Sequence, residues 1–98
     1  MIKVTRYKSQ ITIKGHANYA EHGKDIVCSA VSVLVQTLIK SIESLTTDKI
    51  KYSMSPGTVD INFWCLSDQS KVLIDAFFVG VKGVAAAHPD NVKVIEMF

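Results

Sequence analysis

The chain has 98 residues, enough for a single domain over residues 1–98 and too few for two. Apolar residues make up 48% and charged residues 20%, so the chain can bury a core and does not belong to the disordered class. The net charge of +2 is small and scattered, which argues against a nucleic-acid interface. The apolar runs at 26–35 and 76–81 fall short of the roughly 18 residues of a membrane span, and residues 1–8 do not form a signal peptide. We therefore expect a cytoplasmic protein that binds neither membranes nor nucleic acids.

The first half of the chain predicts two strands and a long helix. Ile2 and Val4 alternate with polar residues, and the same alternation at 11–13 predicts a second strand that ends at Gly15-His16. Residues 18–24 are polar and have no period, which predicts a loop. Asp25 then stands where a helix N-cap belongs. Apolar residues recur after it at the three- and four-residue spacing of an amphipathic helix: Val27, Val31, Leu34, Val35, Leu38, Ile42 and Leu45.

The second half predicts a hairpin, a helix and a last strand. Strands are expected around residues 50–52 and 59–63, joined by a turn at Pro56-Gly57. Ser67 and Asp68 offer caps for a second helix, and a strand follows at 92–95. One face of that helix carries Leu73, Phe77, Gly80, Val81 and Val84. The order ββαββαβ predicts an α+β fold in which two helices pack on a mainly antiparallel sheet.

The two cysteines, Cys28 and Cys65, lack any CxxC pattern or Cys/His ligand cluster. We therefore expect no metal site and no cofactor. A disulfide is not expected in the cytoplasm, so each cysteine needs its own explanation. The usual explanation for a lone cysteine is that it packs as a small buried apolar residue.

Cys28 has a more reactive alternative. If Asp25 caps the helix, Cys28 is the third helical residue, beside free backbone N–H groups and the positive end of the helix dipole, where the thiolate is favoured. His16, at a strand end, could take the thiol proton and pass it to a leaving amine. The plainer interpretations are a packing cysteine, a solvated histidine and an Asp25 that is only a cap; spacing alone does not decide between them.

The segment around Cys28 resembles the Prp family of ribosomal-processing cysteine proteases. That family has a pattern close to G-H-A, a short loop, and then G-x-D-x-V-C-[AS]-A-x-S. Both the residue types and their spacing across the loop agree with this pattern, which makes the match specific. The matching residues are Gly15, His16, Ala17, Gly23, Asp25, Val27, Cys28, Ser29, Ala30 and Ser32.

The resemblance implies a Cys–His dyad, with Cys28 as nucleophile and His16 as base. Asp25 and Ser32 would support the site. Members of the family are homodimers that remove an N-terminal extension from the large-subunit ribosomal protein L-twenty-seven. Their substrates carry bulky apolar residues before the cut and a small residue after it.

Other interpretations stay open. The family also occurs in prophages, where the substrate would be a capsid or scaffold protein. A module that binds ribosomal precursors without cutting them would leave Cys28 as inert packing. His22 is a second candidate base, although the motif favours His16, and Cys65 is interpreted as structural. We further expect the loop 17–24 to act as a gate over the site, with Gly15 and Gly23 as its hinges.

Overall fold

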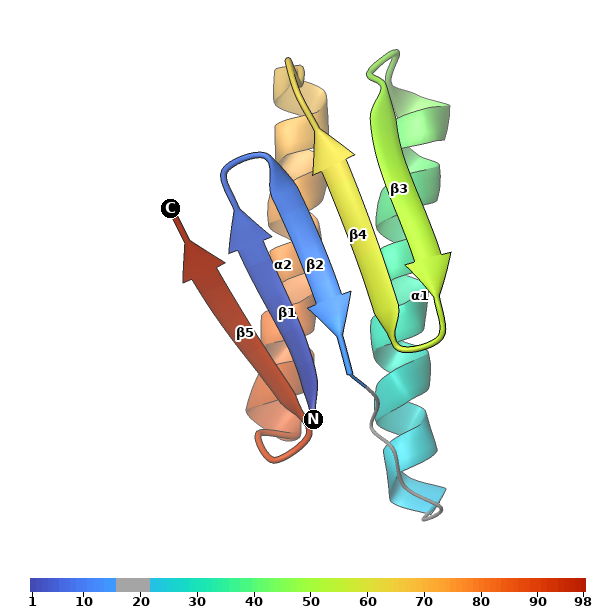
Figure 1. Cartoon of the computed structure of the whole chain (residues 1–98), viewed down its shortest axis with the longest axis vertical. Helices are drawn as coiled ribbons and strands as arrows, with labels where there is room; N and C mark the ends of the chain where they lie inside the picture. Colours follow the sequence, from blue (N-terminus) through green and yellow to red (C-terminus); the bar gives the residue numbers. More distant parts are fainter. Residues whose placement is uncertain (16–21) are drawn as a thin grey trace.

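The computed structural model describes residues 1–15 and 22–98, and for residues 22–25 it describes the backbone alone. The elements follow the predicted order ββαββαβ (Figure 1). They are β1 (Ile2–Tyr7), β2 (Gln10–Lys14), α1 (His22–Leu45), β3 (Ile50–Ser55), β4 (Thr58–Phe63), α2 (Asp68–Ala87) and β5 (Val92–Met97).

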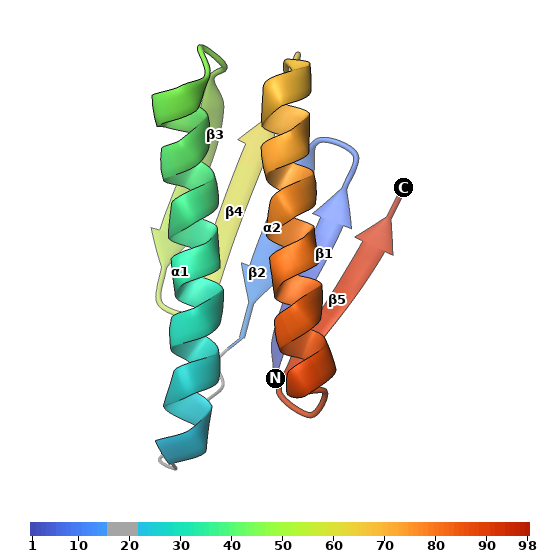
Figure 2. The same cartoon turned by 180° about the vertical axis from the view of Figure 1, so that it is seen from behind.

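The five strands form one sheet in the order β3-β4-β2-β1-β5. All neighbours are antiparallel except β1 and β5, which run parallel. Both helices cover the same face of the sheet and lie side by side, as Figure 2 shows from behind. The predicted α+β fold with a mainly antiparallel sheet is therefore confirmed.

The core fills the space between the sheet and the two helices. Alternate residues of β1 and β2, such as the cross-strand partners Val4 and Ile13, point into it. On α1 the predicted three- and four-residue spacing places Val27, Val31 and Ile42 in the same core, whereas Leu45 is exposed. In length and mean hydropathy, Ile26–Leu45 of α1 would also suffice to cross a membrane. Its buried side chains are instead part of this core.

The beginning of α1 differs from the sequence prediction. The helix begins at His22, so residues 22–24 are not loop and Asp25 is not its N-cap. The first turn extends beyond the ends of the strands (Figure 1), where no sheet lies beneath it. A helical turn beyond the edge of the sheet needs no apolar period, and for that reason the polar stretch resembled a loop. The rest of the predicted loop, residues 17–21, lies outside the described residues.

A carboxylate joins the end of α1 to the start of α2. Oδ2 of Asp48 accepts hydrogen bonds from the Ser67 hydroxyl at 2.6 Å, from the Ser67 amide at 3.0 Å and from the Ser70 hydroxyl. Ser67 is the N-cap of α2, and its side chain in turn accepts from the Ser70 amide. The hydroxyl hydrogen bonds of Ser67 and Ser70 are the main reason why the pKa of Asp48 lies below its ordinary value.

Candidate active site

A cleft of about 390 Å³ opens where the end of β2, the β3–β4 turn and α1 meet. We call it the Cys28 cleft. Most of its walls are apolar side chains from the sheet and the helix. Its lining residues are Ile2, Ile13, Gly15, Cys28, Val31, Ser32 and residues 54–59.

The predicted nucleophile and one predicted supporting residue lie together in this cleft. Cys28 is half-buried and packs against the edge of the core, so its thiol is supported by the fold and still reaches the cleft. Ser32 follows one helical turn later, on the same side of α1, and is exposed. His16 lies outside the described residues, as do the side chains of His22 and Asp25. The pairing of His16 with Cys28 therefore stays a prediction.

Cys28 does not lie in the first helical turn, where the sequence prediction placed it. Because α1 begins at His22, Cys28 lies in the second turn. The free N–H groups of a helix belong to its first four residues, and the effect of the dipole falls off within the first turn. Activation of this thiol by the helix end is therefore not supported.

The two glycines predicted as hinges lie in different backbone settings. Gly15 has a φ of +105°, a conformation that favours glycine, and its role as a hinge stays a prediction. A Cβ atom at this position would also lie 2.2 Å from the carbonyl oxygen of Met1. Gly23 is inside α1 and cannot act as a loop hinge there.

The β3–β4 turn contributes a wall of the cleft that the motif did not indicate. Its central residues are Pro56 and Gly57, and Gly57 has a φ of +76°, as a type II turn requires. Met54, which precedes the turn, has a side chain that is 52% exposed and lines the cleft. The sequence predicted this hairpin, but nothing in it indicated that the turn would lie beside Cys28.

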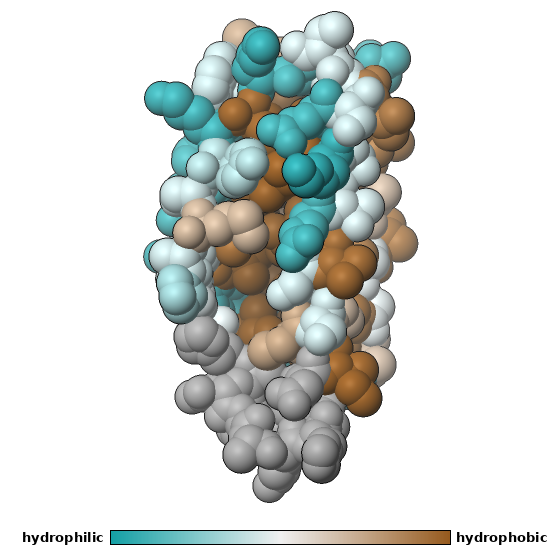
Figure 3. Space-filling model, turned by 90° about the vertical axis from the view of Figure 1, so that its right-hand side faces the viewer, coloured by the Kyte–Doolittle hydropathy of each residue, from teal (hydrophilic) through white to brown (hydrophobic). Residues whose placement is uncertain are grey.

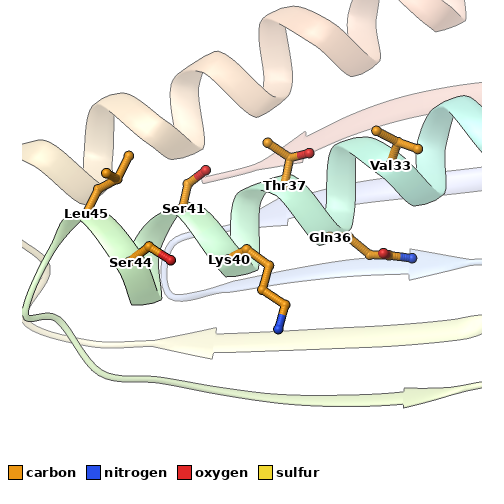
Figure 4. A pocket seen from close by; sticks show the side chains of 7 residues that line it. All are labelled: Val33, Gln36, Thr37, Lys40, Ser41, Ser44 and Leu45. Carbon is orange, nitrogen blue, oxygen red and sulfur yellow. The ribbon is translucent and has the colours of Figure 1, made fainter.

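A second hollow in the described part of the chain lacks the chemistry of a protease. A larger, shallower hollow follows one side of α1, but its polar residues are serine, threonine, glutamine and lysine (Figure 4). In that view the side chains of Lys40 and Gln36 point to one side of the helix. Those of Thr37 and Ser41 point to the other side, so these polar groups do not converge. Cys65 is exposed at the end of β4, which excludes a packing role in the core. Among the described residues, no group of His, Cys, Asp and Glu could hold a metal ion.

Comparison with known proteins decides the family. The model of the family described as cysteine protease Prp matches residues 1–93. The chain belongs to the Prp family. It is therefore a cysteine protease, and Cys28 is the cysteine that its candidate site presents.

Individual Prp proteins support this assignment. The ribosomal processing cysteine protease Prp of Mycoplasma genitalium is 28% identical over 98% of this chain and 96% of its own length. The Prp of Staphylococcus aureus is 24% identical over 87% of this chain and 83% of its own length.

Solved structures show the same fold. Prp from S. aureus, in complex with a covalently linked product peptide, superposes with a TM-score of 0.85 at 18% identity, over 98% of this chain and 97% of that one. SMU.848 from Streptococcus mutans also superposes with a TM-score of 0.85, at 27% identity, over 98% of this chain and 91% of that one.

Proposed function

We propose that this Prp-family protease removes the N-terminal extension of a large-subunit ribosomal protein precursor of the L-twenty-seven type. The observation that carries the proposal is the half-buried Cys28 thiol at the wall of an apolar cleft. The relatives in M. genitalium and S. aureus are named ribosomal processing proteases, which supports a ribosomal substrate. A further S. aureus Prp structure holds a substrate peptide, which supports a peptide as the ligand.

The proposed chemistry is acyl transfer through Cys28. His16 takes the thiol proton, and the thiolate attacks the carbonyl carbon of the scissile peptide bond. The protonated His16 then gives its proton to the leaving amine, the C–N bond breaks, and a thioester on Cys28 remains. Water, deprotonated by His16, hydrolyses the thioester and releases the second product. Ser32 lines the same cleft, where its hydroxyl can bind the polar backbone of the substrate; Asp25 would orient His16.

The walls of the cleft fit the kind of substrate that the family resemblance implies. Ile2, Ile13, Val31 and Met54 offer apolar contact to a bulky side chain. Gly57 lines the cleft without a side chain, so a peptide backbone can approach it closely. A bulky apolar residue of the extension would therefore enter the cleft and place the next peptide bond at Cys28.

Two further properties belong to the proposal. We expect a homodimer, because the family resemblance implies one and because a 98-residue domain has limited core of its own. We also expect a cytoplasmic enzyme, since ribosomal precursors are made there.

The test is cleavage of a synthetic peptide that spans the junction between extension and mature protein. Cys28→Ala and Cys28→Ser should fold with unchanged circular dichroism and lose at least about a thousandfold in kcat/KM, as expected when a nucleophile is removed. Cys65→Ser is the matched control and should cut at the rate of the unmodified enzyme. Cutting by Cys28→Ala at that rate would refute the mechanism. Preferential cleavage of a capsid-type peptide over the ribosomal peptide would instead identify a capsid or scaffold protein as the substrate.

A further inference from the structure

The free edge of the sheet next to the Cys28 cleft is formed by β3. In the strand order, β3 has a neighbour only on one side, where it pairs with β4. Proteins often protect such an edge with charged residues or proline, because its free N–H and C=O groups invite another strand. Between Ile50 and Ser55, β3 contains one charged residue, Lys51, and no proline.

The register identifies which backbone groups of β3 face outward. Ser55 and Thr58 flank a two-residue turn and are therefore a hydrogen-bonded pair. Pairs alternate along the ladder, so Met54 and Tyr52 belong to non-hydrogen-bonded pairs, and their N–H and C=O groups point away from β4.

A hydrogen bond on the far side of β4 agrees with this alternation. The Phe63 amide donates to the carbonyl oxygen of Ser9 at 3.1 Å, away from β3. Within the described part of the chain, the outward groups of Tyr52 and Met54 meet no other strand.

The side chains of the same two residues point toward the helices. Tyr52 and Met54 are paired with Ile61 and Val59, and Ile61 is buried in the core, so all four share the helix-covered face. Tyr52 is nevertheless 43% exposed and Met54 52% exposed, since β3 lies at the edge of the described sheet. Figure 3 views this side of the molecule and shows a trough of apolar atoms between more polar rims along β3 and α1.

Met54 belongs to both the cleft and the free edge, because its side chain lines the cleft and its backbone lies on β3. We propose that the peptide substrate adds to β3 as a sixth strand, with backbone hydrogen bonds to Tyr52 and Met54. Alternate side chains of the peptide then enter the apolar trough, while the others face solvent. This inference rests on the proposed function, since it takes Cys28 as the point of cutting. The opposite edge, β5, has no such connection to Cys28.

Strand addition can be tested independently of catalysis by tethering. In Cys65→Ser, Cys28 is the single thiol, and a short junction peptide with one cysteine can be joined to it by a disulfide. Amide hydrogen exchange, measured residue by residue by NMR, should slow at least about tenfold at Tyr52 and Met54. Lys51 and Ser53 should change little, because their amides already bond to β4. Unchanged exchange at Tyr52 and Met54 would overturn strand addition, even if the free peptide is cut at Cys28. Slowed exchange with a peptide that is never cut would leave strand addition standing and reject the proposed function.

A proline variant tests the same hydrogen bond during turnover. Tyr52→Pro removes an outward N–H and leaves the β3–β4 ladder intact, so the fold should survive. The Tyr52→Ala variant keeps the N–H. The KM of Tyr52→Pro should therefore exceed that of Tyr52→Ala by at least about fivefold, because one hydrogen bond contributes about 1 kcal/mol. Glu96→Pro makes the same change on the outward side of β5 and should leave KM unchanged. Equal KM values for Tyr52→Pro and Tyr52→Ala in folded enzyme would contradict the proposal. If Tyr52→Pro does not fold, the exchange experiment decides.

Discussion

The Gly15 amide donates a hydrogen bond of 2.9 Å to the carbonyl oxygen of Gly57, which joins the end of β2 to the β3–β4 turn. Both glycines have positive φ angles and both line the Cys28 cleft. The bond therefore holds two walls of the cleft together at the point where the chain leaves β2 toward His16.

Replacing Gly15 by alanine should destabilise the protein strongly. The φ of +105° is strained for alanine, and its Cβ would lie 2.2 Å from the Met1 carbonyl oxygen, so we expect a loss of about 2 kcal/mol or more. Gly83→Ala is the matched control, because no atom lies within 4 Å of its Cβ position on α2. It should stabilise the helix by up to about 1 kcal/mol. Urea unfolding of both variants measures the difference, and equal midpoints would contradict the role of Gly15.

His16→Ala should lower kcat/KM by at least about 100-fold, as expected for removal of a general base. His22→Ala should lose much less, because the family motif places the base directly after Gly15. Peptide cleavage by the two variants, at equal folded concentration, measures the ranking. The reverse ranking would assign the base to His22 and require a different alignment of this segment.

Asp48 should make the fold sensitive to acid. Its pKa is lowered in the folded state, mainly by the Ser67 and Ser70 hydroxyls, so its contribution to stability is complete above the ordinary carboxyl pKa of about 3.9. That contribution is lost as the pH falls through the lower folded value. Denaturant unfolding between pH 6 and pH 2 should therefore show a steeper acid loss in the unmodified protein than in Asp48→Asn. If the two proteins lose stability equally steeply with acid, the contact between the end of α1 and the start of α2 does not depend on the charge of Asp48.

The protein should sediment as a symmetric dimer at micromolar concentration. Several apolar side chains on the helix layer are exposed, among them Val72, Val79 and Leu45, and a second copy could cover part of such a surface. Sedimentation equilibrium measures the mass directly. A monomer with full cleavage activity would remove the dimer from the proposal.

The element order could be predicted because each element carries its own local signal. Alternation in Val59, Ile61 and Phe63 indicates a strand with one face in the core, and Ser67 does cap α2 as expected. The start of α1 could not be predicted in this way. Its first turn extends beyond the ends of the strands, and residues 22–25 carry no apolar spacing that would mark them as helical.

The candidate site was only partly predictable for a different reason. Cys28 and Ser32 are one helical turn apart, so local spacing places them on one face. Met54 and Gly57 reach the same cleft through strand pairing, and no sequence spacing expresses that proximity. The edge position of β3 depends on the order of all five strands and therefore also required the structure.

The parallel pairing of β1 with β5 also links the Cys28 cleft to a distant segment of the sequence. Ile2 pairs with Val92, and its amide donates to the carbonyl oxygen of Asn91 at 2.8 Å, so the sheet joins segments from the two ends of the sequence. Ile2 is also a wall of the Cys28 cleft. Contacts at such long sequence separation form late in folding, because the intervening chain must first be ordered. Completion of the cleft wall at Ile2 is therefore coupled to the pairing of β1 with β5, a segment far from Cys28 in the sequence.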